Sequence, residues 1–349
     1  MAGAEEIQQN FQRMEEALKN TRRLIILTHD NPDPDSVSSA VTLAYLVSNK
    51  FQIPASVKYG GIVGRAENRA LIRVLGLHVQ PLKDDDLKRA ADFALVDAQP
   101  GTGNNSFPRS RKPVILIDHH PLRSATKADF IDIRTDYGAT ATILAEYLLE
   151  SGLEIPADLA TALSYGISSE TQDLGREARD PDIRAYLALF PKSNKKLLAR
   201  IEHPRLPRDY FTTLNRALHH SFVYKNAIST CLGEIANPDF VPFIADFMLR
   251  CERISWALCL GRYGDKIIVS IRTTNTKGEA GRFLRRLIGK KGTAGGHGMI
   301  AGGQIACADM EHERCTEIEE ELIRDFLRQL GYKEVGELTP LLTPEPMHS

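Results

Sequence analysis

Three short apolar runs in this chain each stop at acidic or histidine residues. The runs cover residues 24–27, 93–96 and 114–117, and their Ile, Leu and Val content is typical of buried strands. Apolar periodicity predicts helices over residues 5–20, 36–49, 140–150 and 159–167. Strands that alternate with helices along a chain indicate an α/β fold built on a parallel sheet.

The residues that follow these runs are candidates for a metal site. They are His29, Asp33 and Asp35 after the first run, Asp97 after the second, and Asp118, His119 and His120 after the third. In an open parallel sheet, ligands bind beyond the carboxyl ends of the strands, so we expect these side chains to share one crevice. Carboxylates buried together repel each other and require a positive charge among them. A mixture of carboxylate oxygens and imidazole nitrogens suits Mn²⁺, Fe²⁺ or Zn²⁺ better than Ca²⁺ or Mg²⁺.

The number of candidate ligands is sufficient for two divalent ions. Asp97 stands alone at its strand end and is the natural bridge between them. Each element has an ordinary alternative: an Asp after a strand is often a turn residue, and two adjacent histidines can be a core pair. Their occurrence at successive strand ends favours a paired metal site of the kind that hydrolyses phosphate esters.

The chain length and a proline-bearing stretch just past the middle of the chain predict two domains. A chain of 349 residues exceeds one ordinary domain. We expect a catalytic domain over residues 1–192, a linker and connecting helix over 193–225, a C-terminal domain over 226–335, and a disordered, proline-bearing tail over 336–349. The C-terminal domain offers strands at 227–235, 254–262 and 266–272, a helix at 279–288, and a glycine-rich loop at 292–303.

Charge and composition narrow the partners. The formal net charge of −1 argues against a whole-chain basic field for long nucleic acid. No apolar run approaches the ~20 residues of a membrane span, and the polar, acidic N-terminus is unlike a signal peptide. The five cysteines are an odd number without a CxxC pair, which fits a reduced cytoplasmic protein that uses these thiols as core residues.

The motifs together resemble those of the DHH phosphoesterase superfamily. The matching segments are His29-Asp30-Asn31-Pro32-Asp33-Pro34-Asp35, Val96-Asp97, Asp118-His119-His120 and Gly166-Ile167-Ser168-Ser169-Glu170-Thr171. In the C-terminal part, Ser270-Ile271-Arg272 and Gly295-Gly296-His297-Gly298 resemble the DHH-associated domain. The resemblance covers roughly residues 20–310. It implies a doubly wound parallel-sheet catalytic domain and a smaller α/β domain that binds nucleotide.

The resemblance also implies roles for individual residues. His29 and Asp33 would hold one ion, Asp35, His119 and Glu170 would hold the other, and Asp97 would bridge the two, usually Mn²⁺. Asp118 would orient its neighbouring imidazole, and His120 would face the scissile phosphate. The family usually has Asp where this chain has Glu170, so the sequence leaves open whether Glu170 or Asp173 completes the site.

The C-terminal part supplies candidates for substrate binding. Glycines at 295 and 296 would let backbone amides approach an anion, with Arg272 and His297 beside them. The alternatives are a flexible hairpin for the glycine run and an exposed strand charge for Arg272. A basic cluster of Arg282, Arg285, Arg286, Lys290 and Lys291 is either a solvated helix face or a track for a few phosphates.

The leading interpretation is an enzyme like the oligoribonuclease and phosphoadenosine-phosphatase group. Its substrates would be short oligonucleotides, linear dinucleotides or 3′-phosphorylated adenosine nucleotides. The alternatives are a RecJ-like single-strand exonuclease and a non-catalytic nucleotide-binding regulatory protein, with an inorganic pyrophosphatase ranked lower. The sequence leaves the oligomeric state open, a homodimer included.

Overall fold

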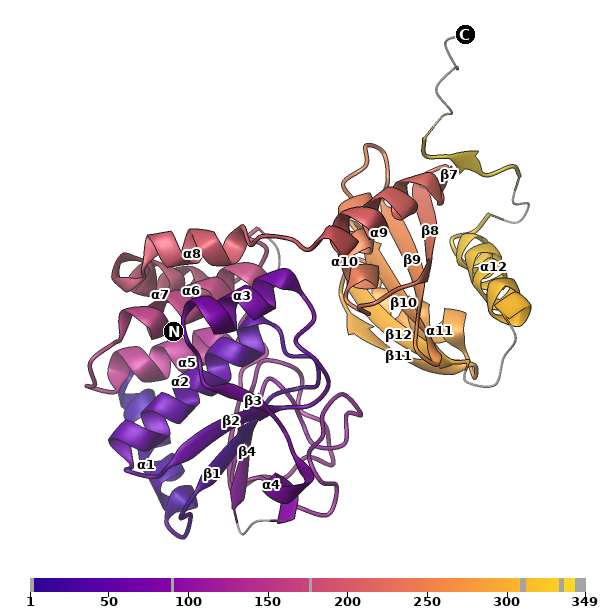
Figure 1. Ribbon diagram of the computed structural model, residues 1–349. Helices are drawn as coiled ribbons and strands as arrows, with labels where there is room; N and C mark the ends of the chain where they lie inside the picture. The colour runs from indigo at the N-terminus through magenta and orange to yellow at the C-terminus, as the bar shows by residue number, and fades with distance from the viewer. Residues whose placement is uncertain (1–2, 89–90, 176–177, 308–311, 333–335, 343–349) are drawn as a thin grey trace. The chain divides into compact units, whose positions relative to one another are not determined.

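The computed structural model describes residues 3–88, 91–175, 178–307, 312–332 and 336–342. The chain divides into two units, Met1–Arg205 and Leu206–Ser349 (Figure 1). This division falls inside the predicted linker over 193–225. Most of that stretch is regular structure, with helix α8 (Lys195–Glu202) in the first unit and helix α9 (Arg208–His219) and strand β7 (Ser221–Tyr224) in the second.

A six-stranded parallel sheet organises the first unit. Its strands are β1 (Leu24–Leu27), β2 (Ala55–Tyr59), β3 (Val79–Pro81), β4 (Asp92–Val96), β5 (Ile115–Asp118) and β6 (Phe130–Ile133), in the order β3-β2-β1-β4-β5-β6. The three strands expected from the apolar runs are confirmed as β1, β4 and β5, and they are neighbours in the sheet. The order reverses direction at β1, so the ends of β1 and β4 flank the position where such sheets bind ligands.

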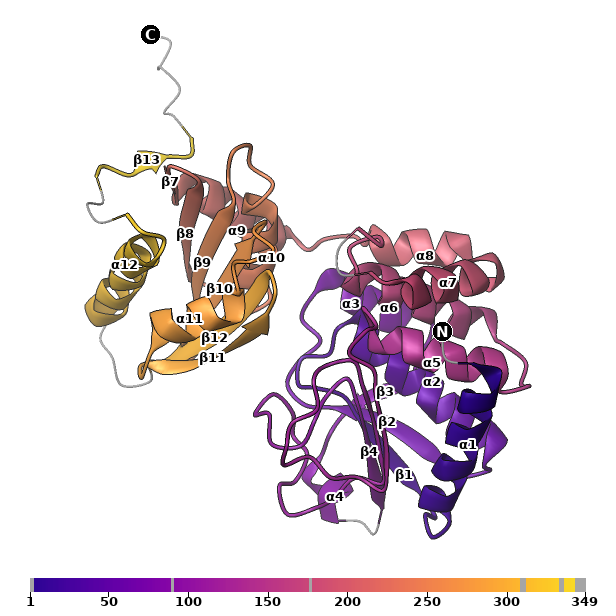
Figure 2. The ribbon, with the colours of Figure 1, turned by 180° about the vertical axis from the view of Figure 1, so that it is seen from behind.

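The two faces of this sheet are covered differently. Helices α1 (Ala4–Leu18), α2 (Pro34–Lys50), α5 (Thr140–Glu150) and α6 (Ala157–Glu170) share one large core with residues such as Ile26 and Ile117. The alternate residues, such as Ile25 and Leu116, face a smaller cluster that includes Leu87 of the short helix α4 (Asp84–Lys88) and Phe107 of a loop. Figures 1 and 2 both place α1, α2 and α5 on one face and α4 on the other.

Three further helices complete the first unit. Helices α3 (Ala66–Val74) and α8 pack against α2 and α6, and α7 (Asp180–Leu189) runs into a single 3-10 turn at Phe190–Lys192. Helix α2 begins with a reciprocal cap, in which the Asp33 side chain accepts from the Ser36 amide and the Ser36 hydroxyl accepts from the Asp33 amide. The same Asp33 that was expected to bind metal therefore also starts the helix.

A seven-stranded mixed sheet organises the second unit. Its other strands are β8 (Ala227–Glu234), β9 (Trp256–Tyr263), β10 (Lys266–Thr273), β11 (Gly292–His297), β12 (Ile300–Ala306) and β13 (Thr339–Pro340), in the order β11-β12-β10-β9-β8-β7-β13. The glycine-rich segment expected to be a loop is instead the β11–β12 hairpin at one edge. Glycine permits this because a Cβ at Gly296 would lie 2.3 Å from the carbonyl oxygen of Ile300.

Part of the tail that was expected to be disordered belongs to this sheet. Strand β13 pairs with β7, and the Leu341 amide donates to the Ser221 carbonyl. Residues 343–349 lie outside the described residues. The expectation of disorder is therefore wrong for the part of the tail nearest the domain.

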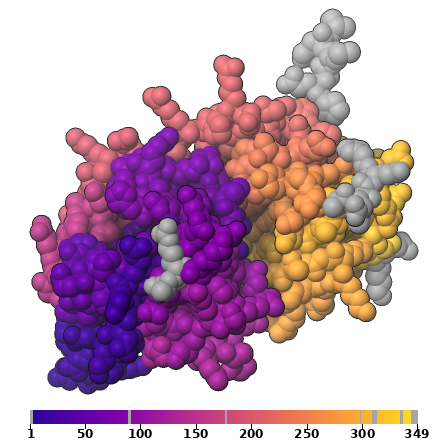
Figure 3. Space-filling view, turned by 60° about the horizontal axis from the view of Figure 1, so that its bottom comes forward, coloured from indigo at the N-terminus to yellow at the C-terminus, as the bar shows by residue number. Residues whose placement is uncertain are grey.

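Helices cover both faces of the second sheet. Helices α9 and α10 (Phe240–Met248) pack on one side, and α11 (Ala280–Ile288) and α12 (His312–Gln329) pack on the other. Side chains fill the spaces between the ribbons of each unit, as the space-filling view shows for one face (Figure 3). Among the described residues, no helix combines the length and apolar character needed to cross a bilayer.

Candidate metal centre

Strand ends bring the predicted histidines and carboxylates of the first unit together. Two groups have potential ligand atoms that all lie within 4.8 Å of one another: His29, Asp33 and Asp97 form one, and Asp97, Asp118, His119 and His120 form the other. Asp97 belongs to both groups. Its backbone has a φ of 54°, the left-handed region that costs most residues energy. This conformation turns the chain sharply at the end of β4.

The first group surrounds the imidazole of His29. Its Nε2 lies 3.4 Å from Asp33 Oδ2 and 3.6 Å from Asp97 Oδ2. Its Nδ1 is 2.9 Å from the Asp30 carbonyl, which fixes the proton on that nitrogen when the ring is neutral and turns Nε2 toward the carboxylates. These three residues thus present one nitrogen and two carboxylates to a common point.

The second group lies on the other side of Asp97. Asp97 Oδ1 is 3.7 Å from His119 Nε2 and 3.7 Å from His120 Nδ1. His119 Nδ1 donates to the Tyr137 carbonyl at 3.2 Å, so its Nε2 faces Asp97. His120 Nδ1 lies 2.9 Å from Asp118 Oδ1, and its side chain is 40% exposed where that of Asp118 is 2% exposed. Asp118 is therefore a buried partner of His120, while His120 reaches toward solvent.

Asp35 is deeply buried against the start of helix α5. Its carboxylate accepts from the backbone amides of Thr140 at 2.9 Å and Ala141 at 2.6 Å. Free amides at a helix N-terminus favour an anion. Asp35 belongs to the same acidic cluster, because Thr140 donates to Asp35 through its amide and to Asp97 through its hydroxyl; burial, followed by Asp97 and Glu170, raises the pKa of Asp35.

Glu170 and Asp173 have different electrostatic neighbours in the structure. The Glu170 carboxylate raises the pKa of Asp35, Asp97 and His120, which places it near the cluster. Asp173 is exposed and instead raises the pKa of Tyr186 and Glu202. Of the two residues left open by the sequence, Glu170 is the one whose charge acts on Asp35, Asp97 and His120.

The electrostatics of this cluster suit a cation. Burial, followed by the neighbouring carboxylates, raises the pKa of Asp35 and Asp97 well above the usual value. Burial alone would lower the pKa of His29, but Asp33 and Asp97 raise it to about 10. Ionised carboxylates and a neutral imidazole are the forms that bind metal. The oxygen and nitrogen donors, their proximity and their shared need for positive charge fit divalent ions of the Mn²⁺ or Zn²⁺ type.

Two residues that hold the cluster in place were not expected from the sequence to do so. The Gln99 amide group donates to Asp118 Oδ2 at 2.8 Å, so Asp118 is held on both oxygens. The Thr140 hydroxyl donates to Asp97 Oδ1 at 3.0 Å. Gln99 stands two positions after Asp97, and Thr140 starts helix α5. Both are common residue types without a distinctive spacing, so pattern alone could not single them out.

The C-terminal candidates lie within the second sheet. Arg272 is only 5% exposed, and its Nε donates to Asp246 Oδ1 at 2.5 Å. It is therefore a buried, ion-paired strand residue, and the alternative of an exposed strand charge is wrong. Gly295 and Gly296 lie on edge strand β11, opposite Gly302 and Ala301. The His297 side chain lies outside the described residues.

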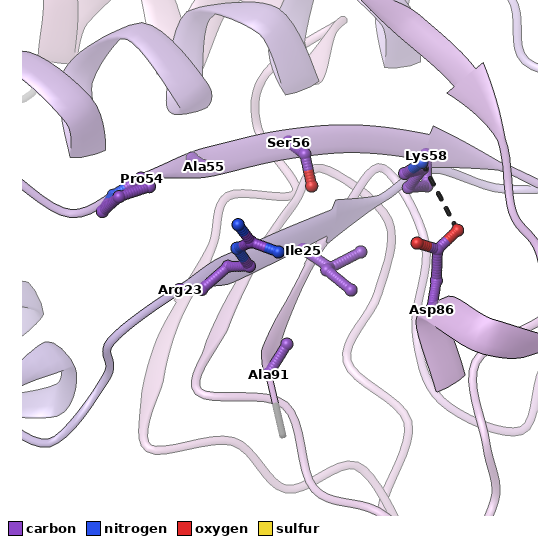
Figure 4. A pocket seen from close by; sticks show the side chains of 8 residues that line it. All are labelled: Arg23, Ile25, Pro54, Ala55, Ser56, Lys58, Asp86 and Ala91. Atoms are coloured by element: carbon purple, nitrogen blue, oxygen red, sulfur yellow. Dashed lines mark ion pairs between the residues drawn. The ribbon is translucent and has the colours of Figure 1, made fainter. Parts of the chain in front are cut away.

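A separate pocket opens on the thinly covered face of the first sheet. Its volume is about 250 Å³, and Arg23, Ile25, Ser56 and Lys58 contribute to its lining. Figure 4 shows Lys58 directed at Asp86, and the Lys58 Nζ to Asp86 Oδ2 distance is 3.3 Å. The pocket contains none of the candidate metal ligands. It is a cavity of the fold rather than an extension of the metal centre.

Comparison with protein families supports the assignment of the first unit. Residues 23–167 match the DHH family, N-terminal domain. This segment contains β1 through most of α6, and with them every candidate ligand except Glu170. The first unit therefore contains a segment that is similar to the N-terminal domain of the DHH family.

Two individual relatives show how far the similarity extends along the chain. An uncharacterized protein of Methanocaldococcus jannaschii is 35% identical over 318 residues, which cover 89% of this chain and 65% of that protein. A probable manganese-dependent inorganic pyrophosphatase of Archaeoglobus fulgidus is 27% identical over 159 residues, covering 42% of this chain and 48% of that protein. The chain thus spans less than two thirds of either relative.

A solved structure supports the fold of the whole chain. The crystal structure of an exopolyphosphatase-related protein from Bacteroides fragilis superimposes with a TM-score of 0.71 at 16% sequence identity. The match covers 93% of this chain and 98% of that one. The parallel-sheet domain followed by a second, mixed-sheet domain is therefore a known architecture.

Proposed function

We propose that this protein is a divalent-metal phosphoesterase of the oligoribonuclease and phosphoadenosine-phosphatase type. The observation that carries the proposal is the position of Asp97, whose two carboxylate oxygens face separate groups of histidine and acidic side chains. A carboxylate shared in this way is suited to hold two cations close together. The DHH family match of residues 23–167 and the manganese dependence named for the pyrophosphatase relatives support the same reading.

The residues divide into two sets of ligands. His29 and Asp33 would hold one ion with Asp97, and Asp35, His119 and Glu170 would hold the other with the same Asp97. When bound, two such ions, most suitably Mn²⁺, supply Lewis acidity that activates water and neutralises phosphate charge. The burial of Asp97 and Asp35 keeps competing water away from these oxygens.

His120 would act on the substrate rather than on the ions. Asp118 binds its Nδ1 and raises its pKa against the opposing effect of burial. Nε2 is then the nitrogen that would contact the scissile phosphate or hand a proton to the leaving oxygen. Gln99 holds Asp118 from behind, so the imidazole keeps one orientation.

Charge on the second unit favours a short substrate. Two of the five residues in the basic cluster are already in ion pairs, Arg282 with Glu279 and Lys291 with Glu321. The remaining Arg285, Arg286 and Lys290 suit contact with a few phosphates. We propose that short oligonucleotides, linear dinucleotides or 3′-phosphorylated adenosine nucleotides bind there, with Arg272, Gly295, Gly296 and His297 near the nucleotide.

Three alternatives remain for the same centre. A RecJ-like exonuclease would prefer long single strands, and a regulatory nucleotide-binding protein would bind without turnover. An inorganic pyrophosphatase is favoured by the relatives of that name, although the Archaeoglobus fulgidus match covers only 42% of this chain.

One assay separates these possibilities. Purified protein with Mn²⁺ is offered a labelled RNA dinucleotide, 3′,5′-bisphosphoadenosine, inorganic pyrophosphate and a long single-stranded DNA. We expect rapid hydrolysis of the dinucleotide or the bisphosphate and little of the other two. Preferred hydrolysis of pyrophosphate or of the DNA would replace the proposed substrate class. No turnover of any substrate, with metal bound, would overturn the proposed activity.

A further inference from the structure

A single turn of the first unit touches three of the proposed metal ligands. This turn, residues 137–141, comprises the end of the β6–α5 connection and the first two residues of α5. The Tyr137 carbonyl accepts from His119 Nδ1, the Thr140 hydroxyl donates to Asp97 Oδ1, and the amides of Thr140 and Ala141 donate to Asp35. His119 and Asp35 belong to one ion in the proposed division, and Asp97 belongs to both.

The turn is itself fastened from two sides by buried groups. Asp182 of helix α7 is fully buried and accepts from the Gly138 amide at 2.9 Å and the Thr142 hydroxyl at 2.5 Å. On the other side, the Tyr137 hydroxyl lies 3.1 Å from Glu146 Oε1, and Arg134 pairs with the same Glu146. Neither anchor is among the candidate ligands. The turn is thus fixed to the fold independently of any ion.

We propose that Thr140 is a positioning residue that sets the geometry of the paired metal site. The inference rests on the proposed function, because it assigns a role toward the same two ions. Thr140 is fully buried and uses both of its donors on ligands: its amide holds Asp35 Oδ2 and its hydroxyl holds Asp97 Oδ1. It therefore ties the bridging carboxylate to a ligand of one ion through a single residue.

The physical reason is orientation of a carboxylate that can otherwise rotate. Burial raises the free-energy cost of an ionised Asp97, and a hydroxyl donor offsets part of that cost in one rotamer only. Partners that orient metal ligands typically change metal affinity by about 10- to 100-fold when they are removed. The expected effect lies mainly on the ion that Asp35, His119 and Glu170 would hold, since the Thr140 hydroxyl orients Asp97 Oδ1, the oxygen that lies 3.7 Å from His119 Nε2.

The chain offers a matched control for removal of a buried hydroxyl. Thr42 of helix α2 is also fully buried, and its hydroxyl has no hydrogen-bond partner among the described residues. Thr140→Val and Thr42→Val each replace a hydroxyl with a methyl group of similar size. Thr140→Ser restores the hydroxyl at the tested position.

The experiment is titration of metal-free protein with Mn²⁺ alone, followed by calorimetry and by the magnetic coupling of the ion pair in electron paramagnetic resonance. We expect Thr140→Val to weaken the binding of the Mn²⁺ ion assigned to Asp35, His119 and Glu170 by about 10-fold or more. The paramagnetic resonance signal of the coupled Mn²⁺ pair should fall with it. Thr140→Ser and Thr42→Val should keep wild-type affinity and coupling. Thermal unfolding of the metal-free variants checks that each is folded.

The outcomes separate this inference from the proposed function. If wild-type protein binds no coupled pair of Mn²⁺ ions, the two-ion centre itself is overturned. If wild type binds the pair and Thr140→Val binds it equally well, only the role of Thr140 is overturned. Equal losses in Thr140→Val and Thr42→Val would also overturn it, since a buried methyl alone would then explain the effect.

Discussion

Buried charges are paired with opposite charges in the second unit, whereas carboxylates gather together at the strand ends of the first. In the second unit, Arg262 of β9 is matched by Glu319 of α12, and Arg272 of β10 is matched by Asp246 of α10. At the strand ends of the first unit, burial, followed by neighbouring carboxylates, raises the pKa values of Asp35 and Asp97. The paired charges of the second unit neutralise each other within the fold, whereas the strand ends keep an excess of carboxylates that His29 offsets only in part, and this excess supports the proposed cation site.

The first unit also contains a balanced group, which makes the comparison sharper. Arg134 pairs with Asp132 and Glu146 within the same core, so this unit is able to neutralise buried acids with its own side chains. The strand-end cluster keeps an excess of carboxylates, although the same unit pairs buried Asp132 and Glu146 with Arg134. The imbalance is therefore specific to the site.

The largest expected effect comes from removal of the shared carboxylate. Asp97→Ala should reduce phosphoesterase turnover below detection and weaken binding of both Mn²⁺ ions, because one change removes a ligand from each.

Asp97→Asn should raise the unfolding free energy of the metal-free protein by about 1 kcal/mol, since it takes a charge out of an acidic cluster. Turnover assays, calorimetry and denaturant unfolding measure these effects, and wild-type-like turnover would refute the bridging role.

Removal of an ion-paired arginine of the second unit should lower the free energy of unfolding rather than the affinity for Mn²⁺. Arg262→Ala leaves Glu319 buried without its partner and should destabilise the protein by about 3–5 kcal/mol while Mn²⁺ affinity stays unchanged. Arg272→Ala should destabilise it less, because the Asp246 side chain is 35% exposed. If Arg272 also contacts nucleotide, its variant alone raises KM. Equal KM values for the two variants would leave Arg272 as a purely structural residue.

The smallest effects concern the last ligand. Glu170→Gln should weaken one Mn²⁺ ion by about 10-fold, because an amide is a poorer partner for a cation than a carboxylate. Asp173→Asn serves as the control and should leave metal binding unchanged, since Asp173 is exposed and faces Tyr186 and Glu202. A loss in Asp173→Asn that equals or exceeds the loss in Glu170→Gln, measured by Mn²⁺ calorimetry, would reverse the assignment.

The sequence predicted the parts of this structure that depend on local pattern. Apolar runs that end in charged residues identified β1, β4 and β5 and the side chains gathered at their ends. The prediction of a loop at 292–303 was wrong because glycine allows both loops and closely packed strands, and only the pairing of β11 with β12 and of β12 with β10 decides between them. Gln99, Thr140 and Asp182 escaped notice because their importance comes from contacts with residues distant in sequence.

The left-handed backbone at position 97 favours some amino acids over others there. Side chains that tolerate this conformation are chiefly glycine, asparagine, aspartate and histidine. A bridge between two cations, as proposed for Asp97, calls for a carboxylate, and aspartate is the carboxylate residue that is enriched at positive φ. Backbone and chemistry thus select the same residue independently. If the paired site is as proposed, natural variants or designed libraries that keep the turn after β4 should be enriched in aspartate at position 97.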